Sequence, residues 1–99
     1  MVSKFIVENI LSAIDELHKE LKFRDVVKLK EYVRKYLLRN DFEKLIVIPC
    51  EYIHEESEIC GEYTAEVHKV IMKRLPMFKQ FIEDMFRIKI DDKILSEVP

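Results

Sequence analysis

Glycine, tryptophan and uncharged polar side chains are scarce in this 99-residue chain. It holds one glycine, no tryptophan, four serines, two asparagines, one threonine and one glutamine. With Gly61 as its single glycine, the chain cannot form the glycine-rich loops that hold phosphates in P-loop and dinucleotide-binding proteins. No serine lies in the glycine-flanked elbow of the α/β-hydrolases. We therefore expect neither a cofactor nor an enzymatic activity.

Long apolar runs are missing as well. The longest stretches without a charged residue span six residues, as at 45–50, whereas about 20 are needed to cross a bilayer. The N-terminal segment reaches Glu8 too early for the apolar region of a signal peptide. We expect a soluble intracellular protein that forms a single domain over residues 1–99.

The residues that are abundant are either apolar or charged. Hydrophobic residues make up 48% of the chain and charged residues 36%, a balance typical of proteins that work at high temperature. The charges are unevenly placed: residues 22–44 carry eight basic and four acidic side chains, while residues 45–68 carry six acidic and no basic ones. We expect ion pairs between the basic segment and this acidic one.

Two amphipathic helices are predicted in the N-terminal part of the chain. Apolar residues recur at positions 7, 10, 14, 17 and 21, with Ser3 as a candidate N-cap. A second period runs through positions 26, 29, 33 and 36 after Asp25, another cap residue, and stops at 39–41. The short connection between them predicts an antiparallel helix hairpin or a kinked pair.

Strands are predicted at two later places. The β-branched run at 44–53 indicates a strand that is at a sheet edge or bulged at Pro49. Ile88 and Ile90 alternate before a turn at Asp91 and Asp92, which fits a hairpin or a strand pairing with 44–53.

Between these strands, a helical period runs through positions 67, 71, 75, 78, 82 and 85 across Pro76. It predicts either one kinked helix or two helices that pack on the same surface. The expected fold is α+β and mostly helical: an N-terminal helix pair, a small antiparallel sheet of two or three strands, and a C-terminal helix or helix pair around Pro76.

The segment PCEYIHEESEIC places Cys50, His54 and Cys60 close together, with His68 further on. On a strand, Cys50 and His54 would lie about 13 Å apart, too far for two ligands of one tetrahedral zinc ion. The surrounding glutamates lack the spacing and glycine of a calcium loop. We predict no metal site, and we interpret the cysteines as two buried thiols. A Cys50–Cys60 disulfide across the acidic connector is the alternative.

The C-terminal segment offers the main candidate interaction surface. Its apolar residues cover a wider arc than the roughly 100° stripe that one core contact needs, which predicts a homodimer of a non-enzymatic interaction module. The surface consists of Met77, Phe78, Phe81, Ile82, Met85 and Phe86. The alternative is a central helix packed on both sides by residues 5–37.

Two other functions compete with self-association. The basic helix at 24–39 predicts nucleic-acid binding through Lys28, Lys30, Arg34, Lys35 and Arg39. The net charge of −2 and the interruption at Glu31 argue against it. Asp91, Asp92 and Lys93 resemble the carboxylate-x-lysine end of some metal-dependent nucleases, with Glu51 as a further metal ligand, but a polar turn explains them better.

As a whole, the nearly glycine-free, charge-rich chain with its segment KLIVIPCEYIHEESEICGEY resembles the small uncharacterised proteins of archaeal lipothrixviruses and rudiviruses, filamentous or rod-shaped viruses of hyperthermophiles. The resemblance implies an unusual fold and a viral accessory or interaction role in the host cytoplasm, with a viral or host protein as a further partner. No functional motif defines that group, so the resemblance assigns no role to any residue.

Overall fold

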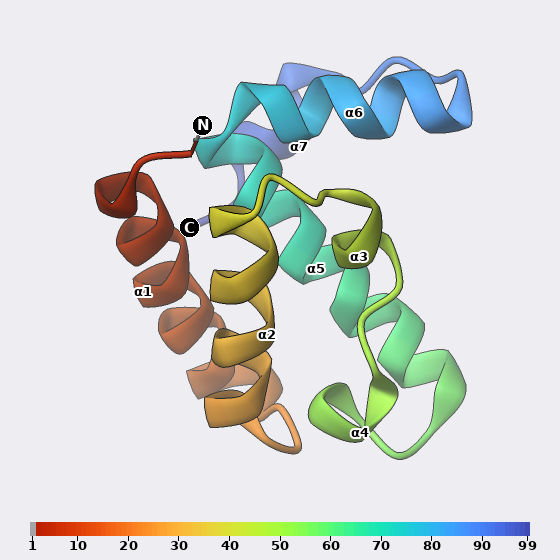
Figure 1. The fold of residues 1–99 in the computed structure, drawn as a ribbon. Helices are drawn as coiled ribbons and strands as arrows, with labels where there is room; N and C mark the ends of the chain where they lie inside the picture. The colour runs from red at the N-terminus through yellow and green to blue at the C-terminus, as the bar shows by residue number, and fades with distance from the viewer. Residues whose placement is uncertain (1) are drawn as a thin grey trace.

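The computed structural model describes residues 2–99, which form seven helices and no strand. The predicted α+β fold with a small antiparallel sheet is therefore wrong, and the described chain is all-helical (Figure 1). The helices are α1 (Lys4–Leu21), α2 (Val26–Leu38), α3 (Glu43–Ile46), α4 (Cys50–Ile53), α5 (Ser57–Arg74), α6 (Pro76–Phe86) and α7 (Asp92–Ser96).

The helices α1 and α2 form the predicted antiparallel hairpin (Figure 1). The Ser3 hydroxyl accepts a hydrogen bond from the Ile6 N–H at 3.2 Å, and the Asp25 carboxylate accepts one from the Lys28 N–H at 3.0 Å. Both N-caps are thus confirmed, since each satisfies a backbone donor that the first helical turn leaves unpaired. Lys22 ends α1 in a left-handed conformation with φ of 55°.

The apolar faces of α1, α2 and α5 meet in one hydrophobic core. The predicted helical periods supply this core, because residues three and four apart lie on one face of a helix. The largest side chains that are completely or almost completely buried are Val7, Ile10, Ile14, Leu29, Val33, Leu37, Leu45, Ile53, Val67, Val70, Ile71 and Phe78.

Residues 44–53 form two short helices joined by an extended link in place of the predicted strand. Side chains from other helices bind the carbonyls that a neighbouring strand would otherwise need to satisfy. The Tyr32 hydroxyl donates to the Lys44 carbonyl at 2.7 Å, and the His68 Nε2–H donates to the Leu45 carbonyl at 2.7 Å. Pro49 then precedes α4 and turns the chain.

The predicted hairpin after α6 is also absent. Arg87 ends α6 in a left-handed conformation, and the Ile88 N–H donates to the Glu83 carbonyl at 3.1 Å. The Ile90 N–H donates to the Glu83 carboxylate at 2.7 Å, so one glutamate satisfies two donors of this segment. Asp91, expected in a turn, is the N-cap of α7 and accepts from the Lys93 N–H at 2.9 Å.

Of the two arrangements predicted around Pro76, the chain adopts two helices. Leu75 has a backbone outside the helical region (φ −133°, ψ 89°), which the residue before a proline avoids. Pro76 opens α6 at the first helical position, where its missing N–H costs no hydrogen bond. As a result α6 lies across the top of the molecule, and its C-terminal end extends outward beyond α3 (Figure 1).

Candidate functional site

The predicted interaction surface on α6 divides into a buried part and an exposed part. Phe78 is completely buried, with its ring edge-on to Phe42 at 5.6 Å between centroids, and Ile82 is buried as well. Both belong to the core of this chain, because they lie on the side of α6 that faces the other helices. They are therefore removed from the candidate surface.

The remaining apolar residues of α6 are accessible. Phe81 is half-buried beside Phe42, whereas Met77 is 49% exposed, Met85 43% and Phe86 54%. Met77, Phe81 and Met85 are four residues apart and so form a row along one side of the helix. Ile88, just after the helix, is 52% exposed and extends the set. We refer to these residues as the α6 surface: Met77, Phe81, Met85, Phe86 and Ile88.

The predicted nucleic-acid face on α2 is partly neutralised by α1. Arg34 pairs with Glu8 at 3.0 Å and Lys30 with Asp15 at 2.9 Å. The expected ion pairs between this helix and the acidic segment 45–68 are replaced by pairs with α1, since the hairpin places its acidic flank against α2. The other three cations of the predicted set are exposed: Lys28 and Lys35 on α2, and Arg39 directly after it.

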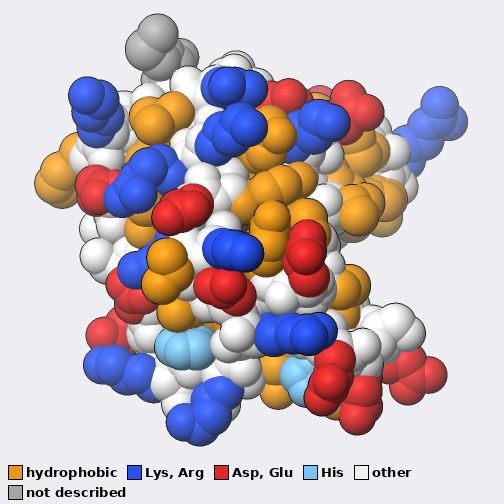
Figure 2. All heavy atoms as spheres, turned by 60° about the horizontal axis from the view of Figure 1, so that its bottom comes forward, with side chains coloured by type: hydrophobic (Ala, Val, Ile, Leu, Met, Phe, Trp, Pro, Cys, Tyr) orange, Lys and Arg blue, Asp and Glu red, His pale blue; other side chains and the backbone are white. Residues whose placement is uncertain are grey.

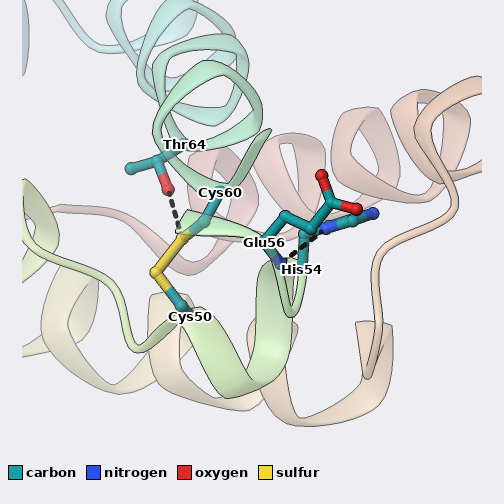
Figure 3. Close-up of a disulfide and its surroundings, with 5 residues drawn as sticks. All are labelled: Cys50, His54, Glu56, Cys60 and Thr64. Carbon is teal, nitrogen blue, oxygen red and sulfur yellow. Dashed lines mark hydrogen bonds between the residues drawn. A yellow bond between two sulfur atoms is a disulfide. The ribbon is translucent and has the colours of Figure 1, made fainter. Parts of the chain in front are cut away.

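Cys50 and Cys60 are joined by a disulfide, with their Cα atoms 5.7 Å apart (Figure 3). The structure therefore has the alternative arrangement in place of two separate thiols. Cys60 is buried in the first turns of α5, 3.9 Å from the Thr64 hydroxyl, whereas Cys50 is exposed at the start of α4. The bridge forms because the chain turns after Pro49, so the strand geometry that we used to separate Cys50 from His54 does not apply.

His54 in this segment and His68 on α5 both bind backbone groups. His54 Nδ1 accepts a hydrogen bond from the Glu56 N–H at 3.0 Å (Figure 3). His68 is turned toward α3, with its ring 5.9 Å from that of Phe78. Within residues 2–99, no group of three or more His, Cys, Asp or Glu side chains is placed to hold a metal ion.

The two aspartates of the hydrolase hypothesis have structural partners. Asp91 caps α7, and the Asp92 carboxylate lies 2.9 Å from Lys79 Nζ on α6. This ion pair lowers the pKa of Asp92 and raises the pKa of Lys79, mainly through the hydrogen bond between them. The ion pair connects α7 to α6, so these aspartates have a structural role in the described chain.

None of the helices in the part of the chain that the structure describes is both long enough and apolar enough to cross a membrane. Comparisons of the chain with protein families, with curated proteins and with solved structures found no match.

Proposed function

We propose that the protein is a non-enzymatic interaction module that forms a homodimer through the α6 surface. The observation that carries the proposal is the row of apolar side chains on a helix whose end extends beyond α3 (Figure 1). Clustered apolar side chains of this kind are unfavourable in water and mark protein contacts. Together with the resemblance described above, this suggests a viral accessory protein that acts in the cytoplasm of a hyperthermophilic host.

The spacing of the row supports a second copy of the same chain as the partner. Met77 and Met85 are each four residues from Phe81. The row therefore has the order Met, Phe, Met whether it is followed from the N-terminal or the C-terminal end of α6. Two α6 helices packed antiparallel about a twofold axis at Phe81 would bring Met77 of one copy against Met85 of the other. A twofold interface needs this self-complementarity, because the same patch contacts itself. Methionine also adapts its shape to a partner surface.

Nucleic-acid binding has less support as an alternative function. Two of the five cations proposed for it are paired with α1, and the chain as a whole is acidic. Each cation contact to a phosphate strengthens binding by releasing counterions, so pairing within the protein reduces this contribution. A mobility-shift assay with duplex DNA at low salt tests this alternative, with Lys28→Glu and Lys35→Glu as the variants that should abolish a shift.

Light scattering at tens of micromolar protein tests the dimer. We expect a mass close to twice that of one chain for the wild type and close to one chain for Met85→Glu, because a charge would be buried at the contact. Val27→Glu is the matched control: Val27 is 60% exposed at the start of α2, away from α6, and its variant should stay dimeric. A wild-type protein with the mass of one chain would refute the proposal.

A further inference from the structure

A surface pocket of about 240 Å³ lies where the α1–α2 connection meets the α4–α5 connection. Lys22 and Arg24 come from the first connection, and His54 and Glu55 from the second. Within residues 2–99, neither Lys22 nor Arg24 makes an ion pair. Two cationic side chains thus line one pocket, and neither is neutralised by a carboxylate in an ion pair within the described chain.

The two halves of this pocket are fixed to each other by backbone hydrogen bonds. The Arg24 N–H donates to the Ile53 carbonyl at 3.0 Å, and the Asp25 N–H donates to the Tyr52 carbonyl at 3.0 Å. The Cys50–Cys60 disulfide then ties α4 to α5. Because these bonds hold both connections, the backbone of the pocket is already ordered before any ligand arrives, which lowers the entropic cost of binding.

A row of four rings supports both connections from the side of the core. The His18 ring stacks on buried Phe23 at 5.9 Å, Phe23 meets Tyr63 edge-on at 6.1 Å, and Tyr63 meets His54 edge-on at 5.7 Å. The row therefore links α1 to the segment after α4 through α5. It holds the His54 ring in one place, directed away from the disulfide (Figure 3).

The hydrogen bond to His54 determines what this ring offers a ligand. Because Nδ1 accepts the Glu56 N–H, the hydrogen of the neutral imidazole must lie on Nε2, which is then a donor. The pocket thus combines an ammonium group, a guanidinium group and an imidazole N–H with one carboxylate, Glu55. Figure 2 shows the corresponding end of the molecule, where histidines at the surface have basic and acidic side chains around them.

We infer that this pocket binds a phosphate group. Arginine pairs with phosphate oxygens through two parallel N–H bonds, and lysine adds a compact charge. The volume of 240 Å³ is several times the roughly 30 Å³ that one water occupies and lies below the usual 300–1,000 Å³ range of drug-sized ligands. This size fits inorganic phosphate or a small phosphomonoester. The site lies apart from the α6 surface and does not depend on the dimer.

Titration with inorganic phosphate at low ionic strength, followed by backbone amide NMR, tests the inference. We expect saturable shifts centred on residues 22–25 and 54–56, which sodium chloride at equal ionic strength does not reproduce. Arg24→Gln should weaken binding about fivefold, the effect of about 1 kcal/mol for an exposed charge pair. Glu55→Gln should tighten it, because the carboxylate that lines the pocket is removed. Lys89→Gln, which removes a cation from another part of the surface, is the matched control and should bind as the wild type does.

A second titration with phenyl phosphate identifies the source of the phosphate. Equal dissociation constants for the two probes would mean that the site recognises the phosphate group alone. Tighter binding of phenyl phosphate would mean that it takes phosphate carried on an organic molecule, and both results support the inference. Shifts that do not saturate, that chloride reproduces, or that change equally in Arg24→Gln and Lys89→Gln would overturn it.

Discussion

At the scale of single residues, His68 is a titratable side chain that lies partly buried between α5 and α3. Its Nε2–H donates to the Leu45 carbonyl at 2.7 Å, and its ring lies beside Phe78. Burial lowers its pKa below the ordinary value of 6.5, an effect that hydrogen bonds to the backbone of Leu45 and Ile46 oppose. The folded protein therefore favours the neutral imidazole, and α3 is attached to α5 through it.

We expect His68 to make the protein less stable in mild acid. The unfolded chain binds a proton at His68 near pH 6.5, whereas the folded chain does so only at lower pH. Between these two values the unfolded state holds more protons, so the free energy of unfolding decreases as the pH falls. This contribution is complete above about pH 6.5 and is lost below it.

Urea unfolding of the wild type and of His68→Gln between about pH 5 and 7 measures this effect. The variant should be less stable at neutral pH, because the bond to Leu45 is altered, but its stability should change less across the range. Parallel pH profiles for the two proteins would show that His68 does not titrate differently in the folded state.

At the scale of the elements, the segment from α3 to the start of α5 is stabilised by links to other helices. Its two four-residue helices are too short to be stable alone. Tyr32 and His68 bind its carbonyls, the α1–α2 connection donates to Tyr52 and Ile53, and the disulfide closes it onto α5. Its structure therefore depends on these links more than on its own helix propensity.

Removal of the disulfide should destabilise the protein by about 3 kcal/mol, the loop entropy expected for a bridge across ten positions. Guanidinium unfolding with and without a reductant measures this, and the double variant Cys50→Ser, Cys60→Ser should match the reduced wild type. Mass measurement after reduction and alkylation counts the thiols released. An unfolding midpoint that is the same in reductant would contradict the prediction.

The sequence predicted α1 and α2 better than the rest of the chain. Residues 57–66, expected to be part of the acidic connector, are the first turns of α5, and the short segments also differ from their prediction. The helices α1 and α2 have regular apolar spacing and cap residues, Ser3 and Asp25, within a few positions of the apolar residues, so local information was sufficient. The segments at 44–53 and 86–90 look like strands because they are β-branched and short. Their backbone groups bind Tyr32, His68 and Glu83, and no local pattern shows which distant side chain will supply a hydrogen bond.

The same limit applies to the candidate sites. The apolar arc at 77–86 is visible in the sequence, but the side of α6 that enters the core is set by its packing against Phe42 and α5. The phosphate pocket joins Lys22 and Arg24 to His54 and Glu55, about thirty positions away. The sequence left the Cys50–Cys60 disulfide open as an alternative, but the predicted strand gave no indication of the turn at Pro49 that precedes α4.

At the scale of the whole molecule, one side of α6 packs into the core, and other apolar side chains of the same helix are exposed to water. Phe78 and Phe86 lie on the same helix, the first fully buried and the second 54% exposed. Phe78 therefore acts in folding, and Phe86 is available for the association that we propose.

Phe78→Ala should lower the free energy of unfolding by about 3–5 kcal/mol, as expected for a phenylalanine removed from a packed core. Phe86→Ala should change the stability of the single chain by no more than about 0.5 kcal/mol while weakening self-association. Denaturant unfolding at a protein concentration low enough to keep the chains apart compares the two. Equal losses in the two variants would mean that Phe86 also belongs to the core.

The connection between α1 and α2 has a consequence for how this chain can be altered. A short link between two helices usually accepts added residues, since connecting loops tolerate insertion. Here the link buries Phe23, and its backbone donates two hydrogen bonds to α4. Inserted residues would shift both donors out of register and pull Phe23 away from Tyr63. The hairpin turn is therefore a poor place to attach a label or a second protein, although it lies at the surface as a short loop.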